Sequence, residues 1–416
     1  MTIHFKNYFL FYVALMFGAL FLSCSSSSDS TQAGGGGGGT SCESRTLSRV
    51  LRSLAVDPTN DSILYVGVEG RGVYKSTDAG STWTKIVNGI QGASTFEGSP
   101  CFNEFRDISI AASDSNKICV SQSSGPNSPS SSPFGTVSGP YCSSDAGLTW
   151  ARGVTGLRNV GGYSIKIDPN TANTVYYGVG DDISNPTSGT GVIYKSTDLG
   201  SVWTELNTSY TSGQSVNRIE VDPSNSNNIF ASMMYLVPQG TGVDGGRYSA
   251  SQVGMIASVN AGSTFTVTNS GMASASPLQQ AITDLTVSSN GLRVFAVTAD
   301  STNAVRNYYS HDASATFTAS GLSSIDYAEF NPNDATGNIL LGINNGLLIR
   351  SANGGVGWGP YGTLPTLPSG ERFTVIRWSF QSSNIIYIGA DKARVYRSAD
   401  AGLTWTQILS EATLPL

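Results

Sequence analysis

An eight-residue phrase with the pattern Ser-x-Asp-x-Gly-x-Thr-Trp occurs seven times in this chain of 416 residues. Its most regular copy is Ser76–Trp83, and the copies recur roughly every 50 residues. Self-similarity at such a period is typical of repeat architectures in which each unit is one supersecondary structure. The repeat therefore constrains the fold more than any other feature of the sequence. Its Asp or Asn positions are Asp78, Asp145, Asp198, Asn260, Asp312, Asn353 and Asp400.

Each copy lies between two short apolar runs, such as Gly72–Lys75 and Thr82–Ile86, and is interpreted as a hairpin turn. The Asp side chain can accept hydrogen bonds from the backbone N–H groups that follow it, which closes the turn. The Gly allows a positive φ without a steric penalty. The final Trp or Phe supplies apolar bulk that we expect to pack against the neighbouring sheet. The Asp residues are thus predicted to be structural.

A second phrase precedes each turn and supplies two more strands. Its first copy is Leu54–Pro58 followed by Leu64–Gly67, so each unit contains four short strands. We predict an all-β fold, a single seven-bladed β-propeller of four-stranded antiparallel blades over residues 44–416. No strand is left over to be shared between the first and last blades. Face-to-face packing should close the ring, helped by a pairing from Cys42–Leu47 or from Leu414–Leu416.

The repeated phrase resembles the Asp-box, or bacterial neuraminidase repeat, and the resemblance extends over about Thr46–Leu409. The sixth copy is the weakest, with Gly357 in place of Thr. Proteins that carry this box include sialidases, xyloglucanase-type hydrolases, sortilin ectodomains and photosystem assembly factors. The resemblance therefore implies a propeller but leaves the function open.

Composition excludes several kinds of site. The net charge of −6 argues against a nucleic-acid partner, which requires a basic surface. His4 and His311 are the only histidines, which disfavours His-based metal sites and Ser-His-Asp catalysis. We therefore expect no metal, no cofactor and no catalytic triad.

The N-terminus is typical of an exported lipoprotein. Residues 1–23 contain Lys6 and then an apolar run that is short for a membrane span, and we interpret them as a signal peptide. Cys24 would be lipidated and would begin the mature chain, although Phe21 departs from the usual Leu of such sites. Residues 24–43, rich in Ser and Gly, would form a flexible tether. The expected location is the outer membrane or cell surface; a plain secretory signal is the alternative.

Four further cysteines suggest disulfides in an exported chain. Alignment of the blades places Cys119 and Cys142 on adjacent strands of blade two, so this pair can form a disulfide. Cys42 and Cys101 would then pair by elimination. Other pairings and free thiols remain open.

Strand alternation places the boxes and the Asp-Pro turns at one end of the propeller. The other end carries loops of unequal length, and the longest belong to blades two to four and to the link into blade two. Long loops in a compact domain are commonly functional or disordered. The candidate binding residues there are Phe96, Glu97, Phe102, Glu104, Arg106, Asp181, Asp182, Tyr235, Asp244, Arg247 and Tyr248.

The inner strands carry polar residues at two matched positions, which we expect to line a central channel and to pair with one another. The first set is Ser53, Asp107, Ser164, Arg218, Asp284, Tyr327 and Arg377. The second is Ala55, Ser109, Lys166, Glu220, Thr286, Glu329 and Ser379.

Three functions remain. The first is a monomeric, non-catalytic scaffold that binds a protein or a glycan through the long-loop face of blades two to four and touches the membrane only through its anchor. The second is a glycoside hydrolase, which needs two carboxyl groups across the scissile bond; the Phe/Tyr-Arg-Ile-Pro motif of sialidases is missing, and xyloglucanase-type enzymes use two propellers. The third is an assembly or chaperone-like factor.

Overall fold

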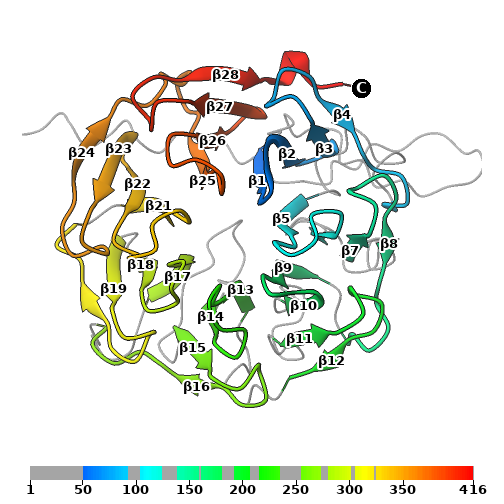
Figure 1. Cartoon of the computed structure of the whole chain (residues 1–416), viewed down its shortest axis with the longest axis horizontal. Coiled ribbons are helices and arrows are strands. Elements are labelled where there is room, and N and C mark those ends of the chain that lie inside the picture. Colours follow the sequence, from blue (N-terminus) through cyan, green and yellow to red (C-terminus); the bar gives the residue numbers. More distant parts are fainter. Residues whose placement is uncertain are drawn as a thin grey trace, which may run out of the picture.

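The structure is a computed structural model, and it describes residues 50–91, 104–123, 138–158, 161–179, 192–206, 215–234, 254–272, 280–300, 305–322 and 325–415. These residues form seven four-stranded antiparallel sheets in which the strands follow one another in chain order. The sheets are arranged as blades around a common centre, with the first strand of each blade innermost (Figure 1). The predicted seven-bladed propeller is confirmed.

The first four blades share one pattern, a long inner pair of strands and an outer strand of two residues. Blade one consists of β1 (Leu51–Asp57), β2 (Asn60–Val68), β3 (Gly72–Ser76) and β4 (Thr84–Lys85). Blade two consists of β5 (Glu104–Ile110), β6 (Ile118–Ser123), β7 (Gly139–Ser143) and β8 (Ala151–Arg152). Blade three consists of β9 (Gly162–Asp168), β10 (Thr171–Val179), β11 (Ile193–Ser196) and β12 (Thr204–Glu205). Blade four consists of β13 (Ser215–Val221), β14 (Ile229–Met234), β15 (Met255–Ser258) and β16 (Thr266–Val267).

Blades six and seven differ from the others in having four-residue outer strands. Blade five consists of β17 (Gln280–Val287), β18 (Val294–Asp300), β19 (Val305–Ser310) and β20 (Thr318–Ala319). Blade six consists of β21 (Ile325–Phe330), β22 (Leu340–Asn344), β23 (Leu347–Ser351) and β24 (Gly359–Gly362). Blade seven consists of β25 (Phe373–Trp378), β26 (Ile386–Ala390), β27 (Arg394–Ser398) and β28 (Thr406–Leu409), and the 3-10 helix η2 (Glu411–Thr413) follows.

The core is divided among the junctions between blades. Both faces of each sheet are apolar, because successive side chains of a strand point to opposite faces. On β2, for example, Leu64 and Val66 pack in the cluster between blades seven and one, whereas Tyr65 packs in the cluster between blades one and two. Each of the seven junctions has its own cluster of this kind. The stability of the ring therefore rests on contacts between neighbours.

The Asp-box turn is closed by its own side chains, as the sequence predicts. In the first copy, Ser76 Oγ donates to Asp78 Oδ1 at 2.8 Å, and the backbone N–H of Thr82 donates to the same oxygen at 2.8 Å. Thr82 Oγ1 donates to Asp78 Oδ2 at 2.6 Å, and Gly80 N donates to Ser76 Oγ at 2.8 Å. Ala79 has φ 59° and Gly80 has φ 90°, so two successive residues are in the left-handed region. The sequence indicated only the second of them.

Three copies depart from this pattern without losing the turn. In the fifth, Ser314 takes the place of Gly with φ 71° and its backbone N–H still donates to Ser310 Oγ. In the third and sixth, Val202 and Gly357 replace Thr, and only their backbone N–H groups reach the Asp or Asn side chain. The backbone bonds to Ser and Asp are thus the constant part of the box.

Blade seven packs directly against blade one, and no strand is exchanged between them among the described residues. Trp83 Nε1 donates to the backbone oxygen of Ile408 at 3.0 Å. Tyr387 Oη donates to the backbone oxygen of Asp61 at 2.9 Å. Leu414 packs against the apolar cluster of this junction, whereas Cys42–Leu47 and Leu416 lie outside the described residues. Face-to-face closure is therefore confirmed.

Cys119 and Cys142 form the disulfide predicted for blade two. They lie opposite each other on β6 and β7, with a Cα–Cα distance of 4.1 Å. Both side chains are buried in the cluster between blades two and three. Cys42 and Cys101, the other expected pair, lie outside the described residues.

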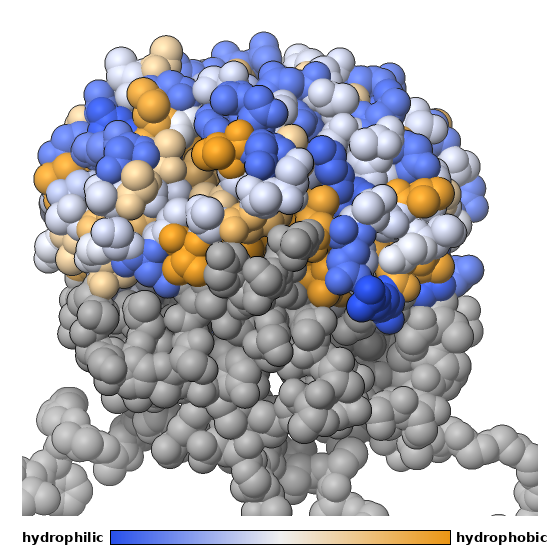
Figure 2. All heavy atoms as spheres, turned by 90° about the horizontal axis from the view of Figure 1, so that it is seen from below, coloured by the Kyte–Doolittle hydropathy of each residue, from blue (hydrophilic) through white to orange (hydrophobic). Residues whose placement is uncertain are grey.

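In the edge-on view of Figure 2 the apolar residues are dispersed among polar ones. No described helix is long and apolar enough to cross a membrane. The predicted signal peptide (1–23), tether (24–43) and Cys24 lie outside the described residues.

Candidate functional site

The two ends of the propeller differ in how tightly their turns are held. One end, here the box end, carries the box turns and the turns between first and second strands. In every blade the residue after the box Asp or Asn donates its N–H to a backbone oxygen in the turn between the first and second strands or at the start of the second strand, as Ala79 does to Ser62 at 2.9 Å. This confirms that both kinds of turn share one end. The opposite end, here the loop end, carries the connections between second and third strands and between blades.

Two of the predicted binding residues lie within the described part of the loop end. Glu104 begins β5, and Arg106 follows on the same strand. The remaining candidates lie outside the described residues: Phe96, Glu97, Phe102, Asp181, Asp182, Tyr235, Asp244, Arg247 and Tyr248.

Glu104 and Arg106 belong to a cluster that connects blades one, two and three, here the rim cluster: Arg52, Glu69, Glu104, Arg106 and Tyr163. Arg52 Nε and Nη2 donate to Glu69 Oε2 at 3.2 and 3.0 Å, and Nη2 lies 3.8 Å from Glu104 Oε1. Arg106 Nη2 lies 2.5 Å from Glu104 Oε2, and the guanidinium lies over the Tyr163 ring at 4.3 Å. Charged groups and one aromatic ring thus alternate along the rim.

The acids of the rim cluster are buried and the guanidinium groups are accessible. The side chains of Glu69 and Glu104 are 9% and 4% exposed, whereas those of Arg52 and Arg106 are 40% and 23% exposed. Burial raises the pKa of Glu69, and the neighbouring Arg52 opposes this shift. A ligand that approached this rim would meet the arginines first.

Sequence reasoning missed Arg52, Glu69 and Tyr163. A signal for two of them was present, since Arg52 and Tyr163 stand directly before the matched inner-strand positions Ser53 and Ser164, as Arg106 stands before Asp107. Glu69 follows the second strand of a blade whose loop is short, so loop length did not indicate it.

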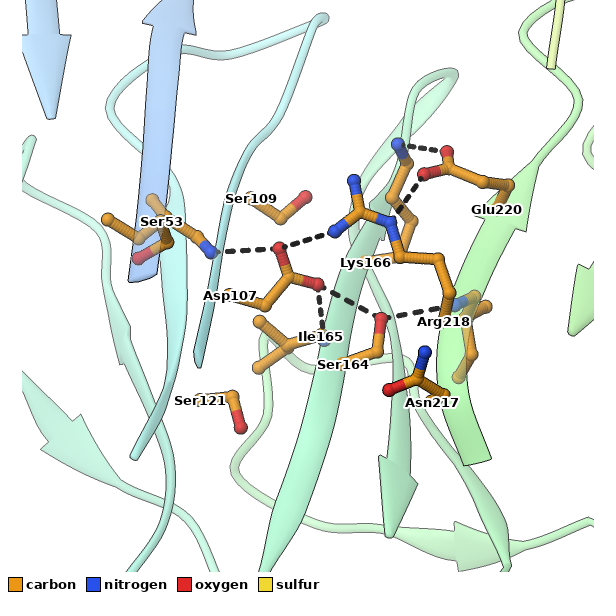
Figure 3. Close-up of polar contacts among 12 residues, drawn as sticks. Ser53, Asp107, Ser109, Ser121, Ser164, Ile165, Lys166, Asn217, Arg218 and Glu220 are labelled. Carbon is orange, nitrogen blue, oxygen red and sulfur yellow. Dashed lines mark hydrogen bonds and ion pairs between the residues drawn. The ribbon is translucent and has the colours of Figure 1, made fainter. Parts of the chain in front are cut away.

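The inner-strand polar residues pair across blades near the centre, as predicted (Figure 3). Ser164 Oγ donates to Asp107 Oδ2 at 3.0 Å, and the backbone N–H of Ile165 donates to the same oxygen at 3.1 Å. Arg218 lies 3.5 Å from Asp107 Oδ1 and 3.3 Å from Glu220 Oε1. These contacts join blades two, three and four.

Within this network the cations Lys166 and Arg218 favour the ionised form of Glu220. Burial alone would raise the pKa of Glu220, but Lys166 and Arg218 keep it below its ordinary value. Lys166 Nζ contacts Glu220 Oε2 at 2.5 Å. Farther around the ring, burial raises the pKa of Asp284 and of Glu329, although Arg377 lies 3.1 Å from Glu329 Oε2. The network is best explained as the internal packing of the ring centre.

The alignment of blade seven was wrong by two residues. Strand pairing places Val375, not Arg377, at the level of Ser53, because Val375 pairs with Gly389 as Ser53 pairs with Gly67. Arg377 belongs to the second set instead. Ser379 then occupies the level of Asp57, so blade seven lacks the Asp-Pro that marks this level in blades one, three and four.

The described residues include no group of three His, Cys, Asp or Glu side chains close enough to hold a metal ion. What the rim cluster offers is hydrogen bonding through guanidinium, carboxylate and phenol groups beside one aromatic ring. Such a set can bind a polar ligand.

Comparison with known proteins supports the fold at low sequence identity. No protein-family model matches the chain, and no curated protein matches it in sequence. Among solved structures, the GH74 xyloglucanase from Xanthomonas campestris is similar with a TM-score of 0.63 and 11% identity, over 88% of this chain and 55% of that one. The GH74 enzyme of Niastella koreensis gives a TM-score of 0.64, 15% identity and the same coverage.

A protein that the chain covers almost completely is also similar. YCF48 from Cyanidioschyzon merolae gives a TM-score of 0.54 with 14% identity, over 85% of this chain and 97% of that one. A structure of YCF48 bound to D1 peptide gives the same TM-score of 0.54. The chain therefore spans only about half the length of the GH74 structures but nearly all of YCF48. At these identities the likeness shows the propeller fold alone.

Proposed function

We propose that this chain is an exported, lipid-anchored and monomeric scaffold whose loop end binds a protein or a glycan without catalysis. The observation that carries the proposal is the contrast between the two ends. At the box end the side chains are used to close turns, whereas the rim cluster presents accessible guanidinium groups over buried acids. The similarity to YCF48, which has been solved with a bound peptide, supports protein binding as one form of this function.

The proposal is tested by photo-crosslinking from each end. The full chain would carry a benzophenone amino acid either at Asn345, in an exposed loop-end turn, or at Ser81, exposed at the box end. Irradiation in an envelope extract of the source organism should give a specific adduct from position 345 and none from position 81. Adducts from position 81 alone would contradict the proposal.

The anchor is a separate part of the proposal. Replacing Cys24 with Ser in the full chain should move the protein from the detergent phase to the aqueous phase on phase partitioning. Retention of the variant in the detergent phase would contradict lipidation at Cys24.

A glycoside hydrolase is the second candidate, because Glu69 and Glu104 both contact one nitrogen of Arg52, at 3.0 and 3.8 Å. Glycoside hydrolysis uses two carboxyl groups about 5–9.5 Å apart that flank the scissile bond. The GH74 structures named above support this alternative. If it holds, the full chain releases reducing sugar from β-glucans, and Glu69→Gln with Glu104→Gln abolishes the release while circular dichroism stays unchanged. An assembly role, the third alternative, would show as formation of a partner complex that depends on this chain.

A further inference from the structure

Each of the seven inner strands contains a β-bulge near its loop end. On β1, Leu51 pairs with Val68 and Ser53 with Gly67, which leaves Arg52 as the extra residue. The same register shift occurs in the other blades. The bulged residues, here the bulge ring, are Arg52, Arg106, Tyr163, Asn217, Thr283, Asp326 and Thr374.

The bulge ring is polar in every blade but differs in residue type. All seven members are at least partly exposed, whereas the residues before them are Gly or apolar, and all but Phe373 are buried. Bulges re-aim a side chain and are common beside binding sites. A position with a purely structural role should keep its residue type, as the Ser and the Asp or Asn of the box do. A constant polarity with a varied identity is compatible with recognition of an irregular polar ligand.

Contacts between members show that the ring is continuous over part of its circumference. Arg52 and Arg106 both contact Glu104, and Arg106 lies over Tyr163. In the next sector, Asn217 Nδ2 donates to the backbone oxygen of Thr283 at 3.0 Å. A ligand bound over either sector would therefore contact more than one blade.

The charges on the ring favour a neutral ligand. Arg52 is held by Glu69, and Arg106 by Glu104. An anion would compete with these carboxylates for the guanidinium N–H groups, and a cation would meet the guanidinium groups first. Hydroxyl groups both donate and accept hydrogen bonds, so they can bind beside paired charges without separating them.

The apolar content of the described loop end is low for a protein interface. Of the nine large apolar side chains that are exposed among the described residues, only Leu347 lies at a loop-end turn. The centre of a protein interface is usually apolar. Because all seven residues of the bulge ring are polar, the ring favours a sugar over a protein as its occupant.

We infer that the bulge ring binds a neutral saccharide at the loop-end centre of the propeller. The inference rests on the proposed binding function of the loop end and narrows its ligand class.

The test uses the full chain and a panel of neutral oligosaccharides, namely cellohexaose, maltohexaose, chitohexaose and xyloglucan oligosaccharides, with sialylated and sulfated glycans for comparison. Binding is measured by isothermal titration at low and at high salt. At least one neutral oligosaccharide should bind, with a dissociation constant that salt changes less than about twofold, because no net charge is neutralised.

Matched variants locate the site. Thr283→Ala in the bulge ring should weaken binding about threefold to tenfold by removing one hydrogen-bonding group, and Tyr163→Ala should weaken it further. Thr77→Ala, an exposed threonine at the box end, should leave the dissociation constant unchanged. Thermal unfolding of each variant checks that the fold is intact.

Two results would overturn the inference. The first is binding that Thr283→Ala and Tyr163→Ala leave as strong as Thr77→Ala does. The second is binding of charged glycans alone, with steep salt dependence. If no sugar binds but position 345 still crosslinks a protein, the proposed function stands and the saccharide inference fails.

Discussion

At the scale of single residues, the Asp-box shows how one carboxylate fixes a turn. Asp145 accepts hydrogen bonds from the backbone N–H and the hydroxyl of Thr149, at 2.9 and 2.6 Å, and one from Ser143 Oγ at 2.7 Å. These bonds favour the charged form and lower the pKa of Asp145 to about 2, with the Thr149 hydroxyl as the largest cause. The same arrangement, led by Thr404, lowers the pKa of Asp400 to about 2. The boxes are therefore most stable when their carboxylates are ionised.

The lowered pKa of Asp145 predicts how the free energy of unfolding falls at acid pH. Because the folded pKa of Asp145 lies below its ordinary value of 3.8, the stabilisation is complete above about pH 4 and is lost as the pH falls towards 2. Asp145→Asn should fold, since Asn260 makes the equivalent bonds in blade four, and its stability should depend less on pH in this window. Asp145→Ala should cost about 1–2 kcal/mol at neutral pH. Urea unfolding midpoints at pH 7 and pH 3 provide the measurement; parallel losses in wild type and Asp145→Asn would contradict it.

At the scale of strands, blade two replaces a cross-strand pair with a covalent bond. In blades one and three, a Tyr on the second strand lies under a Lys on the third, Tyr65 with Lys75 and Tyr176 with Lys195. Lys75 Nζ also donates to the backbone oxygen of Ala146 in the next box at 3.0 Å. The disulfide occupies the same positions on β6 and β7. It therefore replaces the Tyr–Lys pair, whose Lys in blade one also bonds to the next blade.

Removal of the disulfide should destabilise the propeller. Cys119→Ser with Cys142→Ser should lower the free energy of unfolding by about 3 kcal/mol, the value expected for a closed loop of this length. Cys119→Tyr with Cys142→Lys, which copies blades one and three, should recover part of that loss. Denaturant unfolding of the wild type and of the two double variants measures these differences. A double-Ser variant as stable as the wild type would refute a stabilising role for the disulfide.

The sequence predicted the blades, the box turns and this disulfide because the repeat supplies an internal alignment. Where the repeat was altered the prediction was wrong, as for Arg377, since blade seven has Ser379 where blades one, three and four have Asp-Pro. The rim cluster was only half predicted. Glu104 and Arg106 stand beside a long loop, but Arg52 and Tyr163 owe their placement to bulges, which depend on pairing between strands.

At the scale of the whole molecule, the junction between blades seven and one is the one where the two ends of the ring meet. Its contacts include the Trp83 bond to Ile408, the Tyr387 bond to Asp61 and the bond from Gln381 Nε2 to the backbone oxygen of Pro58 at 2.6 Å. At the other six junctions the polypeptide also connects the two blades covalently. A packing defect at one of those junctions should therefore separate the blades less than the same defect between blades seven and one.

Loss of the Trp83 side chain should therefore open the junction between blades seven and one locally, whereas loss of its counterpart in blade three, Trp203, should not. Trp83→Ala should destabilise the protein by about 3–5 kcal/mol and speed hydrogen exchange in β1 and β28 in particular. Trp203→Ala, at an ordinary junction, should cost a similar amount without selective opening of these two strands. Trp83→Phe should lose only about 1 kcal/mol, because Phe265 and Phe317 fill the same position elsewhere. Equal exchange in β1 and β28 of Trp83→Ala and Trp203→Ala would argue against the closing role.

The hydrogen bonds that lock the box end leave the connections between second and third strands free to vary in length. Blade six joins β22 to β23 through Asn345 and Gly346 alone, both with positive φ, yet its strands pair as in the other blades. Such a hairpin should tolerate replacement by a longer segment, because the hydrogen bonds that fix each blade lie in the box turns at the opposite end. The molecule is in this respect a display platform, on which new recognition loops can be grafted blade by blade without redesign of the framework.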